Sequence, residues 1–74
     1  MPQLPTVTGK QVIDALTKID FKVTRQKGSH VRMKREDGRA ITIPKHSGKN
    51  VGKGLLRKIL RDAELTVEEF IDLL

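Results

Sequence analysis

The sequence predicts an α+β fold in which three antiparallel strands form one sheet and helices cover one of its faces. Three observations lead to this class. Apolar residues recur at helical spacing near both ends of the 74-residue chain, the middle alternates between polar and apolar residues, and turn-forming residues divide that middle into three segments. The length suits a single domain over residues 1–74, with the element order α-β-β-β-α-α.

A first helix is predicted over about residues 9 to 19. Thr8 and Gln11 have the spacing of a capping box, in which each side chain accepts a hydrogen bond from the other residue's backbone. The apolar residues that follow at helical spacing are Val12, Ile13, Leu16 and Ile19. This apolar stripe is expected to pack on the sheet.

The next two segments are predicted to form a hairpin. The segment that begins at Phe21 alternates, with Phe21 and Val23 on one face. The segment that begins at His30 alternates again, with Val31 and Met33 facing inward. A glycine-containing turn joins the two strands.

A third strand is predicted over residues 40–44. It follows Asp37-Gly38, a pair favoured in tight hairpins because both residues tolerate positive φ. Pro44 ends the strand because proline has no N–H to donate to the ladder. We therefore expect a three-stranded antiparallel meander with one apolar face, covered by the helices, and one polar face that stays open.

Two more helices are predicted after a polar loop over residues 45–54. The apolar residues of the first helix are Leu55, Leu56, Ile59, Leu60 and Ala63. The second helix begins after Thr66, which has Glu69 at the capping-box position. Its predicted buried side consists of Val67, Phe70, Ile71 and Leu74.

The charge is unevenly distributed along the chain. The formal net charge is +6, but thirteen of the fifteen Lys and Arg residues lie between Lys22 and Arg61, together with only two acids. From Asp62 to the end there are five acids and no base. A basic middle suits a protein that holds a polyanion against one surface, and a solvated basic surface is the alternative.

Composition excludes several kinds of chemistry. The chain has no cysteine, which rules out disulfides, thiolate metal ligands and a thiol nucleophile. Two histidines without a neighbouring carboxylate make a poor zinc site, so no metal or other cofactor is expected. No apolar stretch approaches the roughly 20 residues that span a bilayer, and Met1 does not lead into a signal sequence. We therefore expect a cytoplasmic protein without membrane association.

Strand periodicity places one histidine beside two cations. His30, Arg32 and Lys34 share the face opposite Val31 and Met33. Imidazole takes and gives protons near neutral pH, and nearby cations disfavour its protonated form, so His30 is expected to act as a base. RNA carries its own nucleophile, the 2′-hydroxyl, so a base and fixed cations could cleave it without a metal ion. An inert exposed histidine is the alternative.

The loop after the third strand holds the second histidine and further cations. His46 could be a partner acid, a phosphate contact or an ordinary loop residue. The glycines do not form a P-loop, because their spacing is one residue short and Lys53 is followed by glycine. Lys49 and Lys53 instead lie at a predicted helix N-terminus, where free amides and the helix dipole favour phosphate. Lys58 and Arg61, farther along that helix, are interpreted as a solvated face.

The order and spacing of several short segments match the pattern of a known family. They are Thr8-Gly9-Lys10, Phe21, Arg25-Gln26-Lys27-Gly28-Ser29-His30, Asp37-Gly38-Arg39, Ile41-Thr42-Ile43-Pro44, His46, Leu56-Arg57-Lys58-Ile59-Leu60-Arg61 and Glu68-Glu69-Phe70. Together they resemble the HicA family of toxins from Thr8 to Leu74.

This resemblance implies a fold similar to the double-stranded-RNA-binding domain. It also implies a toxin that cleaves messenger RNA without a metal, inhibits translation and is held inactive by a cognate HicB-like antitoxin. His30 corresponds to the family's catalytic histidine and is expected to be the general acid/base. The residues expected to bind RNA are Arg25, Lys27, Ser29, Arg32, Lys34, Lys45, His46, Lys49 and Lys53.

Two positions depart from the family pattern. Val31 stands where the family often has histidine or an aromatic residue. Gly54-Leu55-Leu56 stands where it commonly has Gly-Thr-Leu, which leaves the second of the three helices without the usual hydroxyl cap. A non-catalytic double-stranded-RNA-binding module is the alternative function, and it would use Lys49 and Lys53 without needing His30. A DNA-binding helical module is disfavoured because the sheet interrupts any helix-turn-helix.

Overall fold

A computed structural model describes residues 3–74 and confirms the predicted fold class. Its elements are α1 (Gly9–Thr17), β1 (Lys22–Lys27), β2 (His30–Lys34), β3 (Ala40–Pro44), α2 (Lys53–Asp62) and α3 (Val67–Leu73). The three strands form one antiparallel sheet in the order β1-β2-β3. This order of elements is compatible with the fold of the double-stranded-RNA-binding domain.

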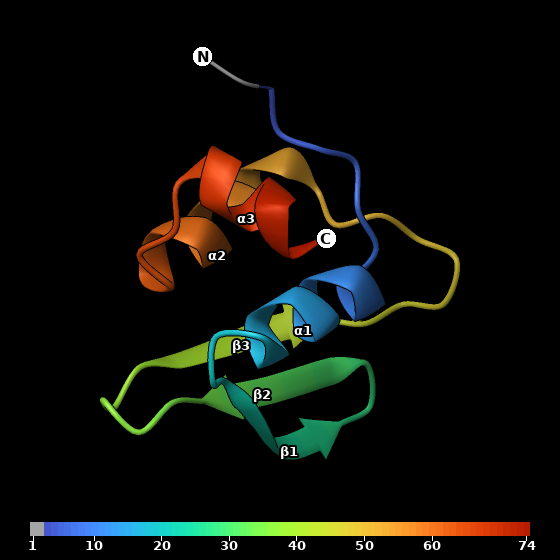
Figure 1. The fold of residues 1–74 in the computed structure, drawn as a ribbon. Helices are drawn as coiled ribbons and strands as arrows, with labels where there is room; N and C mark the ends of the chain where they lie inside the picture. Colours follow the sequence, from blue (N-terminus) through green and yellow to red (C-terminus); the bar gives the residue numbers. More distant parts are fainter. Residues whose placement is uncertain (1–2) are drawn as a thin grey trace.

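The helices lie together on one side of the sheet (Figure 1). α1 and α2 both pack against β3, and α3 packs against α1. The core therefore lies between the helices and one face of the sheet, which we call the covered face. In the described part of the chain no helix packs across the opposite face, which we call the open face, and α2 borders it at the β3 edge.

The predicted capping boxes are present at the starts of α1 and α3. At α1, the Gln11 N–H donates to the Thr8 hydroxyl at 3.3 Å, and the Thr8 N–H donates to the Gln11 side chain at 2.8 Å. Thr66 and Glu69 exchange the same two bonds at α3. α1 ends two residues earlier than predicted, because the chain turns there and Asp20 adopts a φ of 72°.

The two hairpin turns each place a glycine in the left-handed region. Gly28 and Ser29 alone join β1 to β2, and Gly28, with a φ of 58°, takes the first central position of that turn. In the β2–β3 turn, the Gly38 N–H donates to the Arg35 carbonyl at 3.0 Å, and Gly38 has a φ of 92°. Asp37 does not adopt a positive φ, so only the glycine of the Asp-Gly pair uses its conformational freedom.

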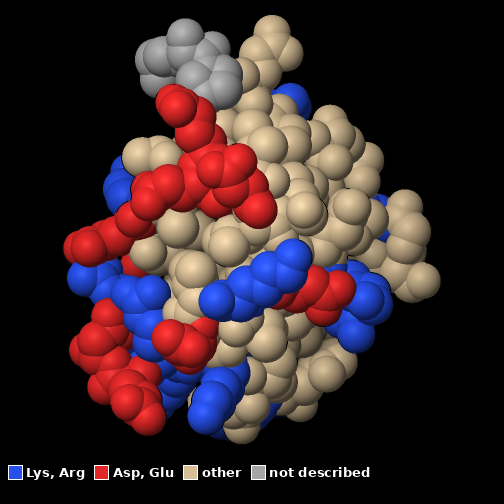
Figure 2. Space-filling view, viewed as in Figure 1, with Lys and Arg blue, Asp and Glu red and all other residues tan. Residues whose placement is uncertain are grey.

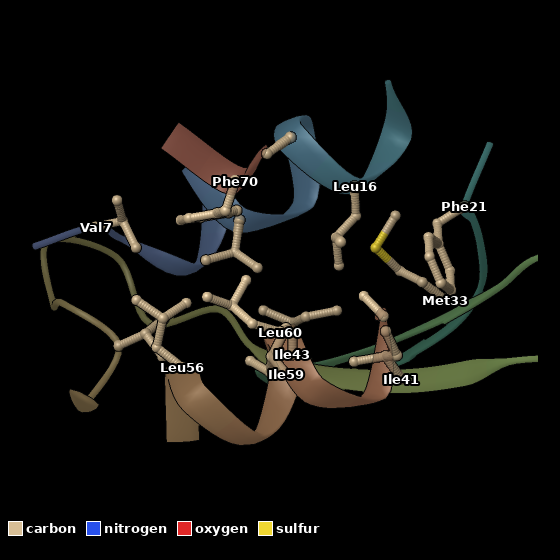
Figure 3. Packing of buried hydrophobic residues seen from close by; sticks show 14 of the residues in the cluster. Val7, Leu16, Phe21, Met33, Ile41, Ile43, Leu56, Ile59, Leu60 and Phe70 are labelled. Atoms are coloured by element: carbon tan, nitrogen blue, oxygen red, sulfur yellow. The ribbon is translucent and has the colours of Figure 1, made fainter. Parts of the chain in front are cut away.

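The buried residues form one apolar cluster to which helices and strands contribute (Figure 3). Phe21 and Phe70 are fully buried at opposite parts of this cluster, with Leu16 and Met33 between the helices and the sheet. Within residues 3–74 no polar or charged side chain is buried. Each large apolar side chain removed from water stabilises the fold by about 1.5–3 kcal/mol before entropy is counted.

Four apolar residues are more exposed than their patterns predict. Ile71 is 39% exposed and Leu74 50%, so the prediction that they lie on the buried side of the last helix was wrong. Val23 is 51% exposed, although its partner Met33 lies on the covered face. Leu55, predicted on the apolar side of α2, is 38% exposed. The helices pack over β3 and leave β1 uncovered, and the short α3 buries Phe70 alone.

Gly9 fixes how closely α1 approaches the sheet. A Cβ atom at this position would overlap the carbonyl oxygen of Pro44 and crowd the Cα atom of Lys45. Because both are backbone atoms, no side-chain movement could relieve the contact. The first residue of α1 therefore sits directly on the end of β3, a close contact that no local sequence pattern predicts.

Candidate nucleic-acid interface

A β-bulge in β1 determines which of its side chains reach the open face. Val23 pairs with Met33 and Arg25 pairs with Arg32, so Thr24 is an extra residue in β1. Side chains directly opposite each other on paired strands share a face. Simple alternation from Val23 would put Arg25 on the covered face. The bulge instead places Arg25 on the open face, beside Arg32.

The open face is basic across all three strands. Lys27 pairs with His30, and Lys22 pairs with Lys34, so both lysines join the cations of β2 on this face. The five cations of the open face are Lys22, Arg25, Lys27, Arg32 and Lys34. All are exposed, as is His30. None of the three strands contains an acidic residue, so no carboxylate within the sheet offsets this charge.

Arg32 is the cation nearest to His30 along β2, and it is held in place. Its Nη1 donates to the Thr42 hydroxyl of β3 at 3.0 Å. On the other side, the Thr24 hydroxyl of the bulge donates to the Arg32 carbonyl at 3.4 Å. A guanidinium fixed in this way presents its remaining N–H groups without first having to be ordered.

His30 lines a cavity of about 380 Å³ between the open face and α2. The strands contribute Arg32, Thr42 and Pro44 to this cavity, and α2 contributes further residues from one side of the helix. Those helical residues are Leu55, Lys58, Ile59 and Asp62. The imidazole is therefore not on a flat surface but at the wall of a hollow that also holds a fixed arginine.

Lys58 and Asp62 form an ion pair at the α2 wall of this cavity. The Lys58 Nζ lies 2.8 Å from Asp62 Oδ2, one helical turn away. The hydrogen bond from Lys58 lowers the pKa of the Asp62 carboxyl, so Asp62 is a carboxylate near neutral pH. Both side chains stay partly exposed, 62% for Lys58 and 38% for Asp62, so the ammonium is accessible from solvent.

His46 and Ser29 belong to a different part of the surface. The Ser29 Oγ lies 3.4 Å from His46 Nε2, and the Lys45 N–H donates to the Ser29 carbonyl at 2.6 Å. Lys45 and His46 line a second hollow of about 320 Å³ beside the start of α1, together with Lys10. His30 does not line this hollow, so the two imidazoles do not share one cavity.

Lys49 and Lys53, the remaining two predicted RNA-binding residues, differ in whether their side chains are already bonded within the protein. Lys49 is exposed in the loop before α2, where its backbone N–H donates to the His46 carbonyl at 3.1 Å. Lys53 is the first residue of α2, and its Nζ donates to the Leu4 carbonyl at 3.0 Å. Lys53 thus ties the N-terminal segment to α2. α2 begins two residues earlier than predicted, and Gly52 caps it without a side-chain hydrogen bond. Leu55, which stands where a threonine was expected to cap the helix, is its third residue.

The acidic end of the chain lies away from the open face. α3, with the sequence VEEFIDL, belongs to the helical side of the molecule, and Figure 2 shows acidic side chains gathered over it. Across residues 3–74 no three His, Cys, Asp or Glu side chains are grouped so that they could hold a metal ion. None of the helices in the described part of the chain has the length and apolar character needed to cross a membrane.

These features define a class of small α+β protein in which one sheet face is buried by helices and the other is basic and carries an imidazole beside a cavity. The sequence profile described as HicA toxin of bacterial toxin-antitoxin matches residues 9–65, and the chain belongs to this HicA toxin family. The family implies a cognate antitoxin as partner. The comparison with curated proteins gave no match.

Sequence reasoning missed several residues that the fold brings to the open face or its cavity, among them Lys22, Leu55, Lys58 and Asp62. Lys22 pairs with Lys34, and strand register rather than sequence spacing reveals that they are neighbours. Leu55, Lys58 and Asp62 reach the His30 cavity because α2 packs along β3. Their spacing of three and four residues shows a shared helix side, but nothing in the sequence shows which strand that side meets.

Proposed function

We propose that this HicA-family toxin is an endoribonuclease that cleaves messenger RNA in the cytoplasm, without a metal ion or other cofactor, and so inhibits translation. His30 is its general acid/base. The observation that carries the proposal is the position of His30 at a cavity on a sheet face with five exposed cations. The cations that bind a polyanion and the imidazole that transfers a proton then lie on the same face of the sheet.

In the proposed reaction, His30 removes the proton from a ribose 2′-hydroxyl. The 2′-oxygen attacks the neighbouring phosphorus, and the bond to the 5′-oxygen of the next nucleotide breaks. The leaving 5′-oxygen takes up a proton, so the products are a 2′,3′-cyclic phosphate and a 5′-hydroxyl. Arg32, fixed by Thr42, stabilises the negative charge that develops on the phosphate oxygens. Finding free 3′-hydroxyl ends on the products would contradict this route.

The other predicted RNA-binding residues divide into two groups in this proposal. Arg25, Lys27 and Lys34 hold the RNA backbone across the open face. Lys45 and His46, with Ser29 beside them, form the second hollow, and together with Lys49 they contact phosphates farther along the chain. Lys53 has a structural bond to Leu4, so we assign it the smallest part in RNA binding.

A HicB-like antitoxin is the proposed partner. A protein with an acidic surface that covers the open face would exclude RNA from His30 and would complement the five cations there. The charge arrangement of the toxin supports this choice, because no acid lies on the strands themselves. The acids next to the open face are Asp20, Glu36 and Asp37, at its Lys22–Lys34 end.

The decisive experiment is to incubate the purified protein with messenger RNA in EDTA and to follow the products. Wild type is expected to cleave, and His30→Ala is expected to lose about 10²–10⁴-fold in rate while keeping its circular dichroism spectrum and its RNA affinity. His46→Ala is the matched comparison, and it should lose much less than His30→Ala because its ring lines a different hollow. An unchanged rate in His30→Ala would refute the role assigned to His30.

The same experiment tests the alternative of a non-catalytic double-stranded-RNA-binding module, with which the order of elements is also compatible. Such a module would retain duplex RNA on a filter or gel and leave it intact at every protein concentration. Growth arrest on expression, relieved by His30→Ala, would count against the module, since a passive binder has no need of the imidazole.

A further inference from the structure

We propose that the cavity between the open face and α2 holds one unpaired nucleotide of the RNA, next to the phosphate on which His30 acts. Lys58 would bind a phosphate of that nucleotide, and Leu55 would contact its base. This assignment rests on the proposed ribonuclease function, and it gives the side of α2 that carries Leu55 and Lys58 a part in substrate binding, where the sequence pattern indicated a solvated face for Lys58.

The size and position of the cavity support this occupant. Its volume of about 380 Å³ lies at the small end of the range for ligand sites, which suits one nucleotide rather than a stretch of RNA. His30 and Arg32 form part of its wall, so a nucleotide placed there has its backbone beside the imidazole and a fixed guanidinium. A base that is paired in a duplex would be held away from such a hollow by its partner strand.

The charged part of the lining suits the phosphate. Arg32 stands on the strand side and Lys58 on the helix side of the cavity. The only carboxylate in the lining, Asp62, already pairs with Lys58 at 2.8 Å. Exposed pairs between residues four apart on a helix are weak, so Asp62 can position the Lys58 ammonium at the wall and still release it to a phosphate oxygen.

The apolar part of the lining suits the base. The chain has no Trp or Tyr, and both phenylalanines are fully buried, so no Phe, Tyr or Trp side chain can stack on a base. The cavity instead offers aliphatic groups from Ala40, Pro44 and Leu55. Leu55 is 38% exposed, which core packing does not explain, and a base face would remove this side chain from water.

The test is a methyl NMR titration of the wild-type toxin with a single-stranded 2′-O-methyl RNA, which cannot be cleaved because its 2′-oxygens are blocked. The largest shifts are expected at the methyl groups of Leu55 and Ala40. Ile71 on α3 and Leu74 just after it, both exposed and outside the cavity lining, serve as internal controls that should not move. Shifts confined to the hollow around His46, with none at Leu55, would overturn the assignment.

A pair of variants on α2 tests the phosphate contact. Lys58→Met should raise KM several-fold with little change in kcat, and it should lower the slope of log K against log salt by about 0.7, the value for one phosphate contact on a single strand. Arg57→Met, an exposed cation on the same helix outside the cavity lining, should change neither. Equal effects of the two variants would show that Lys58 contributes only general charge, which refutes its assignment.

The two proposals fail separately in these measurements. A wild type that cleaves RNA without a shift at Leu55 refutes the nucleotide site and keeps the ribonuclease. A wild type that shows the Leu55 shift but cleaves nothing refutes the ribonuclease and keeps the binding site.

Discussion

The two faces of the sheet are built from alternate residues of the same strands, yet they have opposite properties. In β2, Val31 and Met33 are 2% and 0% exposed, while His30, Arg32 and Lys34 between and beside them are all exposed. The covered face holds the apolar cluster, and the open face holds the cations. A strand of five residues thus supplies both the core and the candidate site.

This difference separates stability from activity. Side chains of the covered face contribute to folding through burial, whereas exposed cations contribute little to folding but interact with a polyanion. Substitutions one residue apart in β2 should therefore change different measured quantities.

The largest effect is expected from a change on the covered face. Met33→Ala should lower the free energy of unfolding by about 2–5 kcal/mol, because it leaves a cavity in a fully buried cluster. The neighbouring Arg32→Ala should stay within about 0.5 kcal/mol of wild type in the same urea titration while its RNA cleavage falls. If both variants lost similar stability, the two faces would not be independent.

Gly9→Ala should have the next largest effect. The added methyl group would overlap the Pro44 carbonyl and force α1 away from β3, at a cost of about 1–3 kcal/mol in unfolding free energy. Gly54→Ala is the matched control on α2, where an added Cβ meets no atom within 4 Å. That variant should be neutral or gain up to about 1 kcal/mol, since alanine favours a helix more than glycine does.

Arg25→Ala tests the bulge on the open face. Because Arg25 pairs with Arg32 on this face, the variant should weaken RNA binding by on the order of 1 kcal/mol and lower the salt slope by about 0.7. Its unfolding midpoint should not change. Loss of folding without loss of RNA affinity would place Arg25 on the covered face instead.

The smallest effect is expected at Val23, which has the register of the covered face but is 51% exposed. Val23→Thr should change the unfolding free energy by no more than about 0.5 kcal/mol. Val31→Thr, at a position only 2% exposed, should cost about 1–3 kcal/mol because it buries an unpaired hydroxyl. The ratio of the two values measures how far the helices extend over the sheet.

Local patterns predicted much of this fold. The capping boxes at Thr8 and Thr66 are confirmed, as are the alternation in β2 and the placement of His30 with Arg32 on one face. These features depend on residues a few positions apart, so a single sequence contains the information. The fold class followed because each apolar stripe needs another to cover it.

The features that were missed depend on contacts between distant segments. Threonine is an ordinary residue in a strand, so nothing at Thr24 indicates a bulge. The bulge, after which the side chains of β1 alternate to the opposite faces, is seen only in the pairing of β1 with β2. Likewise, Leu55 reaches the His30 cavity only because α2 packs along β3. The role of His30, in contrast, stays a prediction from sequence and resemblance, now with a described cavity around it.

The uncovered position of β1 at the edge of the sheet has a consequence for self-association. An exposed edge strand is a template on which a second copy of the same strand can add and start aggregation. All six residues of β1 are exposed, but three of them are Lys22, Arg25 and Lys27. A second β1 laid against the first would bring like charges together, and the bulge at Thr24 would disturb the alignment of the two backbones. The cations of the open face therefore also protect the chain against pairing with itself.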